Sequence, residues 1–155
     1  MNVREVAFRI LLDVYQRGTY SNIALNKAIK EHPFILKDRF FLTRLVYGVI
    51  QYDLRLIYYI NHTLKEEKLR SSMRILLKMA LYQQRFMDKV PIYAIMNESV
   101  EIIKKMDGPL VAKFANAILH KLLKSEFELQ PSDFASEIEY HSIYYSCPLW
   151  ILKLI

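Results

Sequence analysis

The sequence predicts an all-α protein, a bundle of about seven helices over residues 1–124. Apolar residues repeat with the 3.6-residue period of an amphipathic helix in one segment after another. Only 3 glycines and 5 prolines occur among 155 residues, which leaves few of the tight turns that a β-sandwich needs. A composition that is 53 % apolar and 13 % aromatic is sufficient for one packed core.

The first two helices are indicated by local capping signals. Apolar residues over 3–14 keep helical spacing, Asn2 precedes them as part of a capping box, and Gly18 ends the segment. Ser21 is expected to cap a second helix. That helix is short, because the residue before Pro33 avoids helical angles.

The middle of the chain predicts a third, a fourth and a fifth helix. The third runs over about residues 37–51 and the fourth over residues 54–64, each with an apolar stripe. Ser71 or Ser72 is expected to cap the fifth, whose buried stripe continues to Leu81.

Proline and glycine mark the last two helices of the bundle. Pro91 suits the first position of the sixth helix, where a missing N–H is tolerated. Gly108 stops that helix, and Pro109 begins a seventh that ends near Lys124. The seven helices together predict one domain over residues 1–124.

The charge changes sign after residue 124. Residues 1–124 hold 21 basic and 11 acidic residues, a net charge of +10, whereas residues 125–155 hold one base and five acids, a net charge of −4. We expect residues 125–155 to be an acidic linker or a short amphipathic excursion. Residues 148–155 begin another helix with many apolar side chains, which favours either truncation of a longer protein or docking back onto the domain.

Several chemistries lack the residues that they need. No two glycines lie within six residues, so the glycine-rich turn of a nucleotide or S-adenosylmethionine site on an α/β sheet is absent. The four histidines are scattered without metal-ligand spacing. Cys147 lies in an acidic segment that would not activate a thiol. We expect no catalytic residue, no metal and no cofactor in this chain.

The amino terminus and the hydropathy indicate the cellular compartment of the protein. Charged residues in the first turns interrupt any signal-peptide core. No uncharged run approaches the roughly 18 residues needed to cross a bilayer. A single cysteine excludes an intrachain disulfide. We therefore expect a cytoplasmic protein with no membrane partner.

Two helices are expected to carry a basic face. The fifth and the seventh each repeat cations or polar side chains at helical spacing: Arg70, Arg74, Lys78 and Arg85 on the fifth, and Lys113, Asn116, His120, Lys121 and Lys124 on the seventh. Such faces attract nucleic-acid phosphates, although anionic lipid or an acidic protein would satisfy the same charge. The alternative is that both are ordinary solvated faces of amphipathic helices.

Five short segments follow one another in a characteristic order: residues 22–28 (NIALNKA), 38–49 (DRFFLTRLVYGV), 80–83 (ALYQ), 90–101 (with Val90-Pro91 and Asn97-Glu98) and 114–119 (FANAIL). Together they resemble the NusB-like RNA-binding domain, and more closely the version at the amino terminus of the RsmB/Sun family of rRNA cytosine-C5 methyltransferases. Residues 145–150 resemble the Tyr-Ser-His-Pro-x-Trp segment that leads from this domain to the catalytic one. That segment favours the methyltransferase version.

The resemblance implies a fold of two helical subbundles that holds structured or single-stranded RNA. By that resemblance, we expect RNA contacts at Arg4, Lys78, Asn116 and His120. The chain departs from the pattern at His120, where arginine is usual, and at Cys147, where histidine is usual. Both changes remove hydrogen-bonding or cationic capacity, and a neighbouring lysine lacks the bidentate fork of arginine.

Three polar residues of the sixth helix are expected to be structural. By the resemblance, Asn97 and Glu98 join helices through buried hydrogen bonds. Glu101 lies four residues before Lys105, the spacing of an ordinary helix salt bridge. We therefore expect no acid–base chemistry from these carboxylates.

Our leading interpretation is a non-catalytic module that positions rRNA for a methyltransferase whose catalytic domain is missing from this chain. That domain would join the module in cis and bind S-adenosylmethionine. The alternative is a stand-alone NusB-type transcription antitermination factor that binds RNA and a ribosomal protein. A third interpretation is a structural interaction domain whose basic faces contact no RNA.

Overall fold

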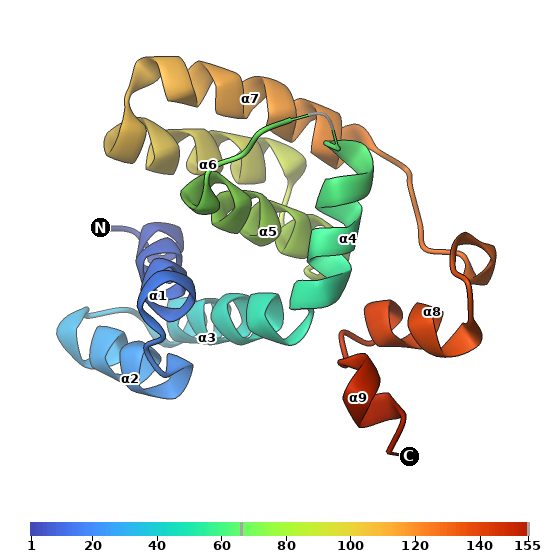
Figure 1. Cartoon of the computed structure of the whole chain (residues 1–155). Coiled ribbons are helices and arrows are strands. Elements are labelled where there is room, and N and C mark those ends of the chain that lie inside the picture. Colours follow the sequence, from blue (N-terminus) through green and yellow to red (C-terminus); the bar gives the residue numbers. More distant parts are fainter. Residues whose placement is uncertain (66, 155) are drawn as a thin grey trace.

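The computed structural model describes residues 1–65 and 67–154, and within them the chain is helical without strands (Figure 1). Ile155, the last residue of the expected tail, lies outside the described residues. The predicted all-α class is confirmed. In chain order the elements are α1 (Val3–Arg17), α2 (Ser21–Glu31), α3 (Leu36–Gln51), α4 (Asp53–Thr63), α5 (Ser71–Phe86), α6 (Ile92–Asp107), α7 (Pro109–Lys124), the 3₁₀ turn η1 (Pro131–Asp133), α8 (Glu137–Tyr144) and α9 (Leu149–Leu152).

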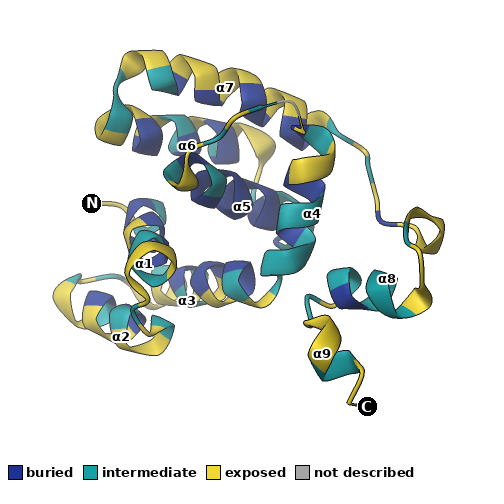
Figure 2. Cartoon of the chain, viewed as in Figure 1, coloured by how far each residue is buried: buried dark blue, intermediate teal, exposed yellow. Residues whose placement is uncertain are grey.

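The helices form two groups that meet at α5 (Figure 1). In one group α1 packs on α2 and α3, and in the other α6 packs on α5 and α7. Because α5 also contacts α1, α3 and α4, it lies at the centre of the bundle, and nearly every side chain from Met73 to Gln83 is buried (Figure 2). This is the predicted bundle of two subbundles.

The helix ends agree with the predicted signals at three positions and differ at three. The Asn2 side chain accepts a hydrogen bond from the Glu5 N–H, Gly18 adopts a left-handed conformation with φ of 70°, and Pro109 is the first residue of α7. The expected serine caps and the position of Pro91 are wrong. Ser21 and Ser71 are already helical, and Pro91 is the cap that precedes α6. Tyr20 and Arg70 cap those two helices with extended backbone and no side-chain bond, so each helix begins one residue earlier than the predicted serine cap allows.

A close approach between α3 and α5 depends on Gly48. A Cβ atom built at Gly48 would lie 2.1 Å from Cζ of Tyr82, far inside van der Waals contact. The Tyr82 ring cannot easily move, because it is buried and stacks on Phe86 with ring centres 5.0 Å apart. Glycine is therefore the residue that lets these two helices pack at this distance.

A buried ion pair links α4 to α5 and reaches α1. Lys78 is only 7 % exposed, and its Nζ lies 2.7 Å from Oδ1 of Asp53. The same oxygen accepts a hydrogen bond from the Tyr15 hydroxyl at 2.5 Å, and the Lys78 ammonium lies 4.3 Å from the centre of the Tyr15 ring. The Lys78 charge is thus paired inside the protein by Asp53 and the Tyr15 ring.

Stability is expected to fall in alkaline solution, partly through Tyr15. Burial, reinforced by the bond to Asp53, raises the pKa of Tyr15 above its usual value of about 10. The unfolded chain then releases a proton that the folded protein retains, so the free energy of unfolding decreases as pH rises through about 10. Tyr15→Phe keeps the ring beside Lys78 and should make this decrease shallower, although Tyr58 and Tyr59, whose pKa values burial also raises, maintain part of it. Urea unfolding of both proteins from about pH 8 to about pH 11 measures the difference, and an equally steep decrease in the variant contradicts the assignment to Tyr15.

The acidic tail docks against α4 instead of extending away from the bundle. The Phe127 ring stacks on His62 with centres 3.5 Å apart and meets the edge of Tyr59. Glu128 pairs with Arg85 and accepts a hydrogen bond from the Tyr59 hydroxyl. Further along, α8 packs on α4. The apolar end over residues 148–154, expected either to mark truncation or to dock back onto the domain, packs through α9 (Leu149–Leu152) on α8, and Trp150 and Leu154 remain exposed.

Within residues 1–65 and 67–154, no helix combines the length and the apolar character that a bilayer crossing requires.

Candidate nucleic-acid interface

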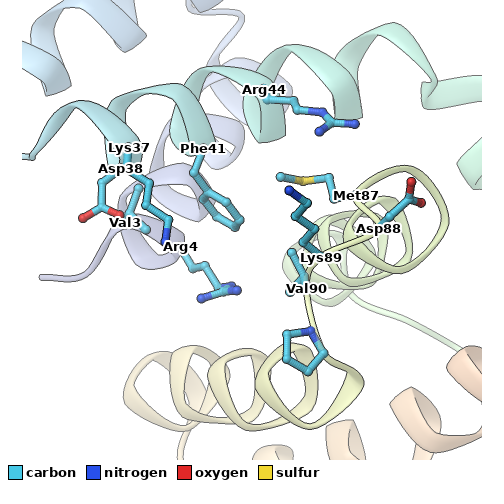
Figure 3. Close-up of a pocket in the computed structure, with 11 residues that line it drawn as sticks. Val3, Arg4, Lys37, Asp38, Phe41, Arg44, Met87, Asp88, Lys89 and Val90 are labelled. Carbon is cyan, nitrogen blue, oxygen red and sulfur yellow. The ribbon is translucent and has the colours of Figure 1, made fainter.

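A cleft opens where the start of α1, one face of α3 and the loop between α5 and α6 meet (Figure 3). It encloses about 650 Å³. Its lining residues are Val3, Arg4, Lys37, Asp38, Phe41, Arg44, Met87, Asp88, Lys89, Val90 and Pro91. Four of these are basic and two are acidic, so the cleft has a local excess of positive charge.

Helix geometry brings the α3 members of this set together. Lys37, Phe41 and Arg44 follow one another at i, i+4 and i+7, the spacing that places side chains on one face of a helix. Figure 3 shows Lys37 and Arg44 on either side of Phe41, with the Phe41 ring directed into the space between the three elements. The opposite wall comes from the loop, where Lys89 is exposed just before the Pro91 cap.

Two of the four cations are held in place by internal bonds. Arg4 Nε donates a hydrogen bond to Oε1 of the buried Gln83 at 2.7 Å, and the Arg4 guanidinium lies 4.8 Å from the centre of the Phe41 ring. Burial lowers the pKa of Arg4, whereas Glu98 and Asp38 act in the opposite direction, and the group remains charged at neutral pH. Arg44 donates a hydrogen bond to the carbonyl oxygen of Phe86.

The other two cations project into the cleft without an internal partner among the described residues. Lys37 and Lys89 are both exposed, and neither takes part in a hydrogen bond or an ion pair there. A pair of anchored guanidiniums beside a pair of free ammonium groups can bind successive phosphates, because the arginines fix the geometry and the lysines supply mobile charge.

The predicted basic face of α7 is present on the surface. Lys113, Asn116, His120, Lys121 and Lys124 are all exposed, and they spread over about 140° of the helix at about 100° per residue. The opposite side of α7 is buried against α5 and α6. Phe114, next to Lys113, is 40 % exposed. No α7 residue lines the cleft among the described residues, so this face is a second, separate basic surface.

The prediction of a solvent-exposed basic stripe along α5 is wrong for two of its four residues. Lys78 is buried on Asp53, and Arg85 pairs with Glu128 and donates to the carbonyl oxygen of Phe127. Both charges are used to join helices and the tail. Arg74 donates to Oδ1 of Asn61, and Arg70 is exposed at the start of the helix.

The prediction of buried hydrogen bonds from the polar residues of α6 is also wrong in part. Glu98 accepts a hydrogen bond from the Asn2 amide at 2.9 Å and so joins α6 to the start of α1, but this bond is exposed. Asn97 and Glu101 are exposed and make no side-chain bond with the described residues. Lys105 pairs with the nearly buried Glu5 carboxylate of α1 in place of Glu101.

Of the four cleft cations, the sequence analysis named only Arg4, as an RNA contact implied by the resemblance, and it missed Lys37, Arg44 and Lys89. The i, i+4, i+7 spacing on α3 was a readable signal, and it lies partly inside the 38–49 segment. Lys89 carried no such signal, because the other three cleft cations are 45 to 85 residues distant in the sequence.

Comparison with known proteins places this fold in a family. The NusB family model matches residues 1–124, which covers the helices α1 to α7 that build the cleft and the basic face. The chain belongs to the NusB family. A transcription antitermination protein NusB from Bacillus velezensis is 30 % identical over 128 residues, covering 81 % of this chain and 95 % of that protein.

Other relatives are longer than this NusB-family chain. A probable ribosomal RNA small subunit methyltransferase B from Synechocystis sp. is 30 % identical over 156 residues, covering 99 % of this chain and 35 % of that protein. A protein of the same description from Bacillus subtilis is 33 % identical over 122 residues, covering 78 % of this chain and 27 % of that protein. The Synechocystis match thus extends through the tail, and the chain spans about a third or less of the length of these methyltransferases. The predicted resemblance is confirmed.

Proposed function

We propose that this NusB-family domain binds RNA in the cleft between α1, α3 and the α5–α6 loop. The observation that carries the proposal is the convergence of Arg4, Lys37, Arg44 and Lys89 on one open space. Phosphate groups supply the negative charge that this arrangement fits. The α7 face extends the same attraction over a second surface, through Lys113, Asn116, His120, Lys121 and Lys124.

We infer further that the domain positions rRNA for a cytosine-C5 methyltransferase. Support comes from the Synechocystis methyltransferase, whose similarity covers the tail as well as the helical domain. In this proposal the catalytic part lies outside the residues of this chain and binds S-adenosylmethionine, which supplies the methyl group. The chain's own residues bind and orient the RNA. A cytoplasmic location belongs to the same proposal.

A second candidate function is transcription antitermination together with a ribosomal protein. It is favoured by the antitermination relatives, whose whole length this chain nearly covers. The two candidates differ in the tail, because the match to the antitermination relative covers only 81 % of the chain. The coding sequence that surrounds this segment in the genome separates them, since only the first candidate requires a methyltransferase domain in the same polypeptide.

Charge reversal in the cleft is expected to weaken RNA binding. Lys37→Glu combined with Lys89→Glu removes two phosphate contacts, and both side chains are exposed, so the fold should persist. We expect the affinity for a fluorescein-labelled single-stranded RNA to fall by at least about tenfold at low salt, since a repulsive charge replaces each attractive one. Fluorescence anisotropy measures the dissociation constant of each protein.

The matched control reverses two cations of α2. Lys27→Glu combined with Lys30→Glu changes the net charge by the same amount away from the cleft. If both double variants lose affinity equally, net charge and not the cleft governs binding, and the proposed site is wrong. The triple change of Lys113, Lys121 and Lys124 to glutamate tests the α7 face in the same assay.

A further inference from the structure

The outer face of α3 presents apolar side chains to solvent. Leu36 is 63 % exposed, Phe40 66 % and Tyr47 39 %. At about 100° per residue these three lie within about 40° of one another around the helix, so they form a single stripe. Apolar side chains on protein surfaces are usually isolated from one another. A contiguous exposed stripe of them therefore indicates a surface that binds another molecule.

This stripe adjoins the basic cleft. On the same helical scale, Arg44 and Lys37 lie about 40° and 60° from Phe40, on the side of α3 that lines the cleft. Arg39, also exposed, flanks the stripe on its other side. Aromatic rings between cations are the combination by which proteins bind single-stranded nucleic acid, since the cations follow the phosphates and the rings stack on bases.

We propose that the α3 stripe is a stacking platform for unpaired RNA bases, with Phe40 and Tyr47 as the rings. The inference rests on the proposed function, because the platform continues the phosphate-binding cleft. A strand that leaves the cleft past Arg44 meets the stripe directly. About 10 Å separates Phe40 from Tyr47 along the helix axis, at 1.5 Å per residue, so two bases can be held without contacting each other.

A second copy of the chain fits this stripe less well. Two copies joined through α3 would bring the flanking Lys37, Arg39 and Arg44 of each against like charges of the other. Three apolar side chains on one helix also cover much less than the roughly 800 Å² per partner of a stable interface. The charge pattern therefore favours an anionic partner with flat apolar faces, which describes unpaired RNA.

The test compares Phe40→Ala and Tyr47→Ala with the starting protein on three labelled probes. The probes are a single-stranded RNA of about 12 nucleotides, the same strand in a duplex, and an abasic strand with the same number of phosphates. We expect each substitution to weaken binding of the single strand by about tenfold and to leave binding of the duplex and the abasic strand unchanged. Phe40→Tyr and Tyr47→Phe keep the rings and should retain full affinity.

Tyr20→Ala is the matched control, because Tyr20 is 74 % exposed and lies outside the α3 stripe. It should change none of the three affinities. Unchanged single-strand binding by Phe40→Ala and Tyr47→Ala, or equal losses on all three probes, overturns the platform. Sedimentation that shows a dimer dissociated by Phe40→Ala also overturns it in favour of a second copy.

Different experimental results would contradict the stacking platform and the proposed function. If the starting protein binds none of the probes, the proposed function itself is wrong. Alternatively, the unmodified protein binds the abasic strand and loses that binding in the Lys37→Glu, Lys89→Glu double variant. That result supports the cleft as the phosphate-binding site, independently of the α3 variants. Melting temperatures of all variants verify that the exposed substitutions leave the bundle folded.

Discussion

Asp53→Ala is expected to destabilise the protein by about 3–5 kcal/mol, because it leaves the buried Lys78 ammonium without its counter-charge. The substitution also removes the acceptor of the Tyr15 hydroxyl. Since the pair joins α4 to α5 and contacts α1, its loss weakens the junction of the two helix groups. Urea unfolding monitored by circular dichroism gives the free energy of unfolding.

Two further variants separate the buried pair from charge removal in general. Asp13→Ala removes the carboxylate of an exposed pair with Arg17 and should cost no more than about 0.5 kcal/mol. Replacing both partners, Asp53→Leu with Lys78→Met, should recover most of the stability, because no buried charge is left unpaired. A loss below about 1 kcal/mol in Asp53→Ala would show that Lys78 reaches water in the folded protein.

Gly48→Ala is expected to destabilise by about 3 kcal/mol, although alanine is the better helix former by about 1 kcal/mol. The added methyl group would overlap the Tyr82 ring, which is buried against Phe86. Either α3 moves away from α5 or the aromatic stack shifts, and both changes disturb the centre of the bundle. Thermal or urea unfolding measures the loss.

The steric origin of this loss can be isolated. In a Tyr82→Leu background the ring is absent, so Gly48→Ala should be neutral or stabilising there. Ala117→Gly, on the exposed face of α7, changes only the helix propensity. It should lower the free energy of unfolding by about 1 kcal/mol. Equal effects of Gly48→Ala in both backgrounds would mean that Tyr82 is not the obstacle.

The helices could be predicted from the sequence because their signals are local. Apolar spacing, the Asn2 cap and the Gly108-Pro109 boundary each act within a few residues, and the structure keeps all of them. The serine caps failed because Ser21 and Ser71 are already helical, and the residues before them cap α2 and α5 through their backbone alone.

Which charged side chains form internal ion pairs and which face solvent could not be predicted from local signals. Periodicity placed Lys78 on a basic stripe, but its partner Asp53 is 25 residues away and belongs to another helix. Arg85 is likewise taken by Glu128, 43 residues further on. The cleft itself assembles α1, α3 and the α5–α6 loop, so its charge appears only when tertiary contacts bring these elements together. Spacing within one helix cannot report such contacts.

The central claim, that this NusB-family domain holds RNA by its phosphates, is tested most directly by the salt dependence of binding. The dissociation constant of the unmodified chain for a single-stranded RNA should be measured by anisotropy from about 50 mM to about 200 mM salt. The account predicts a linear loss of log affinity with log salt, with a slope of about −0.7 for each phosphate contacted, hence near −3 if all four cleft cations engage. A flat salt response, or no binding at low salt, would contradict it.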